Sequence, residues 1–206
     1  MTDDALLGYS PGVYDIELSE IELEYLDGLT ERPLGAAYTI YRPFYGSIGL
    51  SQGYSTSHPA FDWPVSMNTK LYNMFPHQAR VSFAGYTSEG YAYQVRVLSA
   101  EYNLMSLVAH MPANGLRVKT GDMVDVIQLV GLSDNTGNST GPHVHTEIRK
   151  APFAGYANCV NFWSWLKPLP SEPPAPPPPP PVEKKIIDLA GVHVNGKKYA
   201  GRVTEV

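Results

Sequence analysis

The sequence has little cysteine, no long apolar run and no excess of basic residues. Cys159 is the only cysteine among 206 residues, which excludes an internal disulfide and a metal site built from several cysteines. We interpret it as a partly buried thiol beside aromatic residues. No run of about 18 apolar residues occurs, so no transmembrane segment is expected. The formal net charge of −5 argues against a nucleic-acid partner, which usually meets a basic face.

The first residues also lack the features of a secretory signal. Met1-Thr2-Asp3-Asp4 is acidic, whereas a signal peptide begins with basic residues followed by an apolar stretch. We therefore expect synthesis in the cytoplasm and export, if any, by another route. A hydrophobic content of 43% with 17% charged residues does predict a packed core, and the length suits one domain with extensions.

The pattern along the chain predicts a mostly β domain between an acidic N-terminal extension (1–35) and a C-terminal linker and tail. Within the extension, segment 16–23 fits a strand by its alternation and a helix by its Glu and Leu content, and both remain open. Residues 36–167 contain short strand-like segments separated by Gly and Pro, which favours an antiparallel sheet or sandwich. We expect strands at 38–41, 71–73, 78–84, 91–99, 104–110, 123–129 and 143–149, and a short helix at 161–166.

The C-terminal part divides into a spacer and a hairpin. Residues 168–182 are dominated by proline, which favours an extended polyproline II spacer over a ligand for a proline-binding module. Residues 183–206 contain Asn195-Gly196 between alternating residues, which predicts a β-hairpin. This tail is too short for a core of its own, so we expect it to dock on a partner protein or a larger assembly such as a virion.

The most informative stretch runs from Gly131 to Arg149. A glycine-rich lead-in precedes an alternation that places His143, His145 and Glu147 on one strand face. Side chains two apart on a strand lie about 6.6–6.8 Å from one another, which lets one histidine hold a metal while the other faces a substrate. For Glu147, an orienting contact to an imidazole and a solvent-facing position are both open.

A second cluster supplies further metal-binding side chains. His58 and Asp62 are four apart, and the prolines at 59 and 64 favour a turn that brings them together. A catalytic zinc usually has three protein ligands, so His58, Asp62 and one of His143 and His145 form a suitable set. His110 ends an apolar strand and, taken alone, fits a surface residue. His77 is interpreted as an exposed loop residue, with a minor contact in the substrate groove as the alternative, and His193 as a surface strand residue.

Together these motifs resemble the lysostaphin-type (LytM-like) zinc metalloendopeptidases, from about Arg42 to Arg149. The resemblance implies a β fold of the duplicated-hybrid-motif type with a bound Zn²⁺. The matching segments are 42–44, 51–54, His58 with Asp62, 109–110, 118–124 and 131–147. By resemblance the metal ligands are His58, Asp62 and His145, and the catalytic histidines are His110 and His143. Tyr54 is a further candidate, as a hydrogen-bond donor to the oxyanion.

The resemblance implies hydrolysis of peptide bonds in peptidoglycan cross-bridges or stems. The sequence departs from the family at Ala60, where glycine is usual, and at Thr146, where an aromatic residue is usual. All five polar residues remain, so we expect an active enzyme. The alternative is a catalytically inactive LytM-like structural or wall-binding module of a larger assembly. The lack of a recognisable signal peptide fits a phage origin, because phage lysins reach the cell wall through holin pores or as part of the virion.

Overall fold

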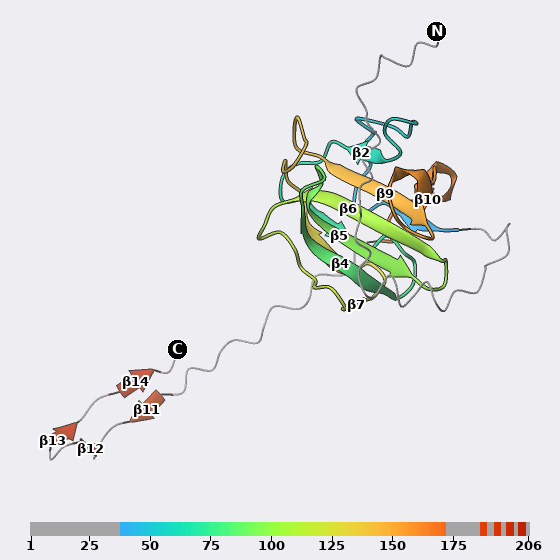
Figure 1. The fold of residues 1–206 in the computed structure, drawn as a ribbon. Helices are drawn as coiled ribbons and strands as arrows, with labels where there is room; N and C mark the ends of the chain where they lie inside the picture. The colour runs from blue at the N-terminus through green and yellow to red at the C-terminus, as the bar shows by residue number, and fades with distance from the viewer. Residues whose placement is uncertain (1–37, 172–185, 189–191, 195–196, 200–201, 205–206) are drawn as a thin grey trace, which may run out of the picture. The chain divides into compact units, whose positions relative to one another are not determined.

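The computed structural model describes residues 38–171 and, near the C-terminus, residues 186–188, 192–194, 197–199 and 202–204 (Figure 1). The chain divides into two compact units, Met1–Glu172 and Pro173–Val206. Segment 16–23, for which strand and helix were both open, lies outside the described residues. In the described part of the chain, no helix is long and apolar enough to span a membrane.

A six-stranded antiparallel sheet positions the functional site, with the strand order β2-β9-β6-β5-β4-β7 (Figure 1). Alternation and a high content of β-branched and aromatic residues favour its long strands. In spatial order the strands are Phe61–Trp63 (β2), Val144–Lys150 (β9), Leu104–Met111 (β6), Ala92–Ser99 (β5), Ala79–Thr87 (β4) and Met123–Val124 (β7).

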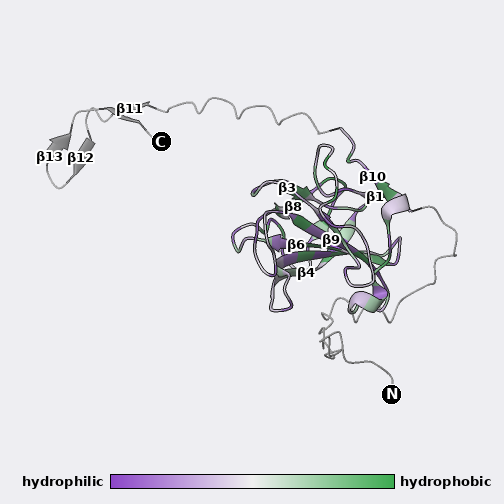
Figure 2. Ribbon diagram, turned by 90° about the horizontal axis from the view of Figure 1, so that it is seen from above, coloured by the Kyte–Doolittle hydropathy of each residue, from purple (hydrophilic) through white to green (hydrophobic). Residues whose placement is uncertain are grey.

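One face of this sheet packs on the hydrophobic core. Val144 and Ile148 of β9 and Val108 of β6 join one buried cluster with residues from two smaller sheets. In these, β3 (Lys70–Tyr72) pairs with β8 (Leu129–Leu132), and β1 (Ile40–Tyr41) pairs in parallel with β10 (Leu166–Lys167). Strand β6 is mostly hydrophobic, whereas β9 contains both hydrophobic and hydrophilic residues (Figure 2). The opposite face of β9 is therefore free to carry polar side chains.

The mostly β, antiparallel fold expected from the sequence is confirmed, with differences at short elements. Each of the seven expected strands has a counterpart. The segment 123–129 divides into β7 and β8, because a turn closed by the Gln128 N–H and the Asp125 carbonyl (3.2 Å) interrupts it, with Ile127 at φ 61°. Strand β2 was not expected, since Pro59 and Pro64 on either side of it favoured a turn.

The short helix expected at 161–166 is wrong. The structure has only a single 3₁₀ turn there, Trp163–Trp165 (η2), preceded by another at Tyr156–Asn158 (η1). Leu166 turns to extended backbone at φ −72° and ψ 130°, because it pairs with Ile40 of β1. Tertiary pairing thus overrides the local preference of this aromatic segment.

The second unit contains two antiparallel strand pairs. Ile186–Asp188 (β11) pairs with Arg202–Thr204 (β14), and Val192–Val194 (β12) pairs with Lys197–Tyr199 (β13). Val194 lies opposite Lys197, the register of a hairpin with a two-residue loop. The expected C-terminal hairpin is therefore confirmed.

Candidate active site

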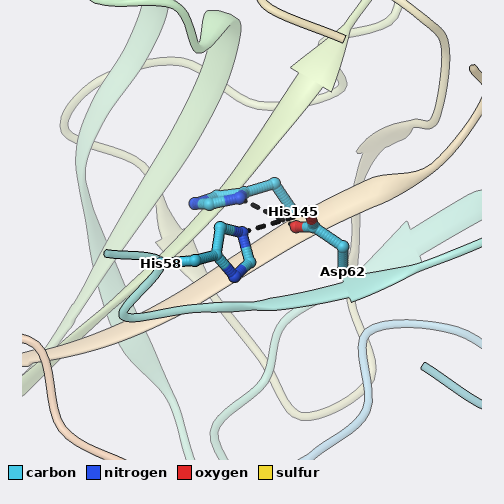
Figure 3. Close-up of side chains that lie close together, drawn as sticks. All are labelled: His58, Asp62 and His145. Carbon is cyan, nitrogen blue, oxygen red and sulfur yellow. Dashed lines mark hydrogen bonds and ion pairs between the residues drawn. The ribbon is translucent and has the colours of Figure 1, made fainter. Parts of the chain in front are cut away.

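Strand register brings the first two candidate ligands together. Asp62 of β2 lies directly opposite His145 of β9, and Asp62 Oδ1 is 2.9 Å from His145 Nδ1. His58 lies three residues before the start of β2, and its Nε2 is 3.1 Å from Asp62 Oδ2. Figure 3 shows both imidazoles directed at the same carboxylate. Side chains that are 83 residues apart in sequence therefore meet at one point.

These three side chains can hold a metal ion. One ligand atom from each of His58, Asp62 and His145 lies within 4.8 Å of the other two. Two imidazole nitrogens and one carboxylate oxygen form a donor set typical of catalytic zinc, which leaves a fourth position open. The donor chemistry and the spacing therefore both fit a metal.

Each of the two imidazoles is held through its other ring nitrogen. His58 Nδ1 lies 3.3 Å from the Gly53 carbonyl, and His145 Nε2 lies 2.9 Å from Glu147 Oε1. Because a carbonyl and a carboxylate only accept, these nitrogens carry the proton. The nitrogens that face the Asp62 carboxylate donate to it, and an ion would take the place of these protons, in the arrangement usual for metal-bound histidines.

A backbone irregularity directs His110 toward the same point. Val108 belongs to the core cluster, and strict alternation would bury His110 on the same side. Instead the pairing of β5 with β6 shifts between Tyr93 and Val95, and His110 adopts φ 62°. Positive φ is uncommon for a residue other than glycine and often marks functional positions. The His110 ring centroid lies 5.6 Å from that of His145.

His143 completes a group of four imidazoles. Its ring centroid lies 4.5 Å from that of His110, and its Nε2 lies 3.8 Å from Asp62 Oδ2. His143 Nδ1 donates to the Gly141 carbonyl (2.8 Å), and His110 Nδ1 donates to the Thr136 carbonyl (2.7 Å). Both histidines therefore have Nδ1 engaged by the loop before β9, which leaves Nε2 available for chemistry.

Beneath His145 lies a buried polar network centred on Glu147. Its Oε1 accepts from the Tyr91 hydroxyl at 2.6 Å as well as from His145, and its Oε2 accepts from Arg149 Nε at 2.6 Å and from the Cys159 thiol at 3.2 Å. Glu147 and Arg149 are fully buried. Of the two readings of Glu147, the contact that orients an imidazole is the one observed, and solvent exposure is wrong.

The electrostatics follow from burial and these contacts. Burial opposes the charge of Asp62, but hydrogen bonds from His145 and His58 outweigh it and lower the pKa of Asp62 far below its usual range. Burial also opposes the charge of His145, yet its bonds to Asp62 and Glu147 raise the pKa of His145 to about 9. By contrast, burial and the neighbouring His145 and His143 lower the pKa of His110 to about 4. His110 is therefore a neutral base near pH 7.

A cavity of about 250 Å³ opens over the four imidazoles. Its wall includes the β4–β5 hairpin and the glycine-rich loop before β9, which meet at Gly137. Gly137 has φ 77°, and a Cβ there would collide with the Gly90 carbonyl oxygen. A second cavity of about 330 Å³ shares Gln52, Asp62, Thr140 and His143 with the first. We call these two adjacent cavities, which share Asp62 and His143, the groove.

Two other candidates lie elsewhere. The Tyr54 hydroxyl donates to the Cys159 carbonyl (3.2 Å), and Tyr54 does not line the cavity over the histidines. The candidate oxyanion donor thus has a different partner in this structure. His77, expected to be exposed, is half-buried, with Nε2 2.6 Å from Ser99 Oγ, outside the site.

The structure explains why Thr146 can stand where the lysostaphin-type family usually has an aromatic residue. Thr146 is fully buried on the core face of β9, where its Oγ1 donates to the Phe61 carbonyl (2.9 Å) and accepts from Trp63 Nε1 (3.2 Å). The Trp63 indole therefore supplies aromatic packing next to the position where the family usually has an aromatic side chain.

Sequence reasoning missed Tyr91 and Arg149 as supports of the site. Arg149 continues the alternation of His143, His145 and Glu147, so a polar stripe on a central strand was the available signal. Since a buried charge needs a partner, Glu147 and Arg149 two residues apart on one face predict an ion pair. Tyr91 comes from another strand and had no local signal.

The comparisons with known proteins agree with this geometry. The model of peptidase family M23 matches residues 56–159, half of the chain, and the chain belongs to that family. It is a metallopeptidase family whose lysostaphin-type members share this fold.

Individual relatives are more distant. An uncharacterized metalloprotease of Buchnera aphidicola subsp. Baizongia pistaciae is 39% identical over 51 residues, which cover 25% of this chain and only 14% of that protein. The antimicrobial peptidase lysostaphin from Staphylococcus simulans has a TM-score of 0.50 at 19% identity, covering 73% of this chain and 58% of that one. A zinc containing peptidase from Vibrio cholerae has a TM-score of 0.51 at 17% identity, covering 66% and 41%. These two structures show a shared fold.

Proposed function

We propose that the protein is a zinc-dependent endopeptidase that hydrolyses peptide bonds in bacterial peptidoglycan. One observation carries the proposal: four imidazoles surround one carboxylate, and each has one ring nitrogen held by an acceptor and the other directed to the site. A purely structural cluster has no need for this uniform orientation. Membership of the M23 family supports the same activity.

Within this proposal, the residues divide into a metal-binding set and a reacting set. His58 Nε2, Asp62 and His145 Nδ1 would hold the ion. Bound zinc would polarise the scissile carbonyl and lower the pKa of a water molecule. His110 is neutral because its pKa is about 4, which leaves its Nε2 free to accept the proton of the attacking water. The same proton would then pass from His110 to the leaving amine. His143 Nε2, on the same side, would hydrogen-bond the reacting carbonyl when it carries a proton of its own.

The groove supports a peptide substrate. The two cavities meet at Asp62 and His143, so an extended chain can continue on both sides of the reacting bond. Neither cavity is lined by lysine or arginine, which leaves the histidines as the only basic side chains along its described walls. Peptides of the cross-bridges or stems of peptidoglycan are the substrates we propose.

Digestion of purified peptidoglycans of known cross-link, followed by mass spectrometry of the fragments, tests the activity and names the bond. We expect new peptide termini from the wild type, about one zinc ion per chain, and loss of both with His145→Ala. His193→Ala removes a histidine from the second unit and serves as the matched control. Wall digestion by His145→Ala at the wild-type rate would remove His145 from the ligand set.

We further propose that the protein is phage-encoded, with residues 1–35 as an extension, 168–182 as a spacer and 183–206 as a tail that docks on a partner. Detection of the protein in purified virions supports a particle component. Its presence only in lysates supports a free lysin.

A further inference from the structure

A third cavity lies on the opposite side of β2 from the candidate metal ligands. Alternation along β2 directs Asp62 to the metal site and Trp63 to the core side, where a cavity of about 400 Å³ opens. This size is within the range of small-ligand sites. None of its lining residues belongs to either cavity of the groove. We call it the Trp163 cavity, lined by Arg42, Ser47, Ile48, Gly49, Trp63, Trp163, Leu166, Lys167 and Pro168.

The exposed indole ring of Trp163 lines this cavity. Trp163 is 55% exposed, although it is a large apolar side chain. Its inner side lies over the buried Trp63, with the ring planes 16° apart and the centroids at 6.3 Å. The ring centroid of Phe61 lies 5.5 Å from that of Trp163. Trp163 therefore packs on two buried rings and still leaves about half of its surface to solvent at the cavity.

The backbone around Trp163 holds the ring in place. The Trp163 N–H donates to Asn161 Oδ1 (3.1 Å), and the Trp165 N–H donates to the Phe162 carbonyl (3.0 Å). Trp165 is in turn packed against Tyr38, with ring centroids 4.5 Å apart. A fixed, exposed aromatic face loses little conformational entropy when it binds a ligand, and such exposed apolar surface often marks a binding site.

Two cationic residues, Arg42 and Lys167, line the same cavity as Trp163. The Arg42 N–H donates to the Lys167 carbonyl (2.9 Å), which ties the two residues together across β1 and β10. The Arg42 guanidinium carbon lies 6.0 Å from the Trp63 ring centroid. The lining contains no aspartate or glutamate, and no described residue forms an ion pair with Arg42 or Lys167. The charge of the cavity therefore complements an anion.

We propose that the Trp163 cavity binds a saccharide chain that carries carboxylate groups. A pyranose ring presents a face of C–H groups, which suits the electron-rich face of an indole. A carboxylate on the same sugar meets Arg42 and Lys167, with arginine able to bind it through two parallel hydrogen bonds. Single-stranded nucleic acid also combines stacking rings with anions, but it needs a longer row of cations than this cavity offers, and the net charge of −5 opposes it.

This site goes beyond the proposed hydrolysis, because it holds the sugar polymer and not the peptide that is cut. It would keep the protein on the wall between cleavage events. Its occupant contains no peptide, so its binding is measured independently of turnover.

Calorimetric titration with soluble glycan strands, freed of stem peptides by an amidase so that their lactyl carboxylates are exposed, tests the proposal. The full chain should bind them, and Trp163→Ala should weaken binding by about tenfold or more, the effect of removing one stacking ring. Lys167→Gln should weaken it by about two- to fivefold. Tyr86→Ala and Lys119→Gln are matched controls, since both residues are exposed and lie outside the three cavities.

Other readouts separate the proposal from its rivals. Neutral chitooligosaccharides of the same length should bind more weakly, and a single-stranded oligonucleotide should not compete. Equal binding of the neutral sugar, stronger binding of the oligonucleotide, or equal affinities of Trp163→Ala and Tyr86→Ala would overturn it. Hydrolysis of a short soluble peptide should be unchanged in Lys167→Gln, and thermal melting verifies that each variant is folded. If the wild type cleaves no peptide, the glycan titration still decides whether the cavity binds saccharide.

Discussion

The two faces of strand β9 are buried to the same extent, yet they are stabilised in different ways. Val144 and Ile148 on one face, and Glu147 and Arg149 on the other, all have no exposed surface. On the core face, removal of apolar area from water is itself stabilising, by about 25 cal/mol per Å². On the site face, burial is unfavourable unless every charge and donor finds a partner.

This difference predicts how each face responds to change. A core face tolerates small changes of volume, because its contacts are many, weak and non-directional. The site face depends on a few directional bonds to Glu147, so the loss of one partner leaves a charge without compensation. A substitution on the site face should therefore cost more stability than one of similar size on the core face, and should also affect metal binding.

The largest effect is expected from Arg149→Met, which leaves the buried carboxylate of Glu147 without its guanidinium partner. Breaking a buried ion pair by removing one partner costs about 3–5 kcal/mol. The adjacent change Ile148→Val, on the core face, should cost only about 0.5–1.5 kcal/mol. Urea unfolding of both variants measures the difference in the free energy of unfolding. Equal losses would contradict the distinction between the faces.

A smaller effect, on metal affinity, is expected from Glu147→Gln. The carboxylate that orients the metal-facing nitrogen of His145 is lost, and changes of this kind weaken metal binding by about 10–100-fold. Cys159→Ser is the matched control, because it keeps a donor to the oxygen of Glu147 that does not contact His145. Competition with a chromogenic chelator gives the affinity, and ¹⁵N shifts of the imidazole report which ring nitrogen carries the proton. An affinity equal to that of Cys159→Ser would remove Glu147 from this role.

The smallest effect concerns pH and the metal-free protein. The pKa of His145 is raised to about 9 in the fold, above its unfolded value of about 6.5. Its contribution to stability is therefore complete below about pH 6.5 and is lost as the pH rises through about 9. We expect the Tm of the metal-free protein to fall by about 5 °C or more over this window.

Metal should reduce this fall, since an ion at His145 Nδ1 takes the place of the proton that titrates. The low pKa values of Asp62 and Glu147 keep both carboxylates charged throughout the window. Melting curves with and without zinc, and of metal-free His145→Ala, provide the measurement. The same slope in all three would contradict the assignment.

Much of this fold could be predicted because its signals are local. Alternation marked the long strands, and His143, His145 and Glu147 were placed on one face by the period of the strand alone. The positions that failed depend on distant contacts. Strand β2 exists because β9 lies beside it, and the 3₁₀ turn of Trp163–Trp165 is cut short because Leu166 pairs with β1.

The position of His110 could not be deduced from alternation either. Its ring reaches the site only because the register of β5 and β6 shifts near it and because its φ is 62°. Neither feature leaves a mark such as glycine or asparagine in the sequence. The motif resemblance supplied this residue where the strand period would have buried it.

The position of β2 at the end of the six-stranded sheet has a dynamic consequence. Asp62 belongs to this terminal strand and His145 to its inner neighbour, so an ion held by both would clamp the edge of the sheet. Terminal strands open more readily than central ones, because fewer contacts hold them. Escape of the ion and opening of β2 would then be one event. Slow amide exchange along β2 would report how long the ion stays.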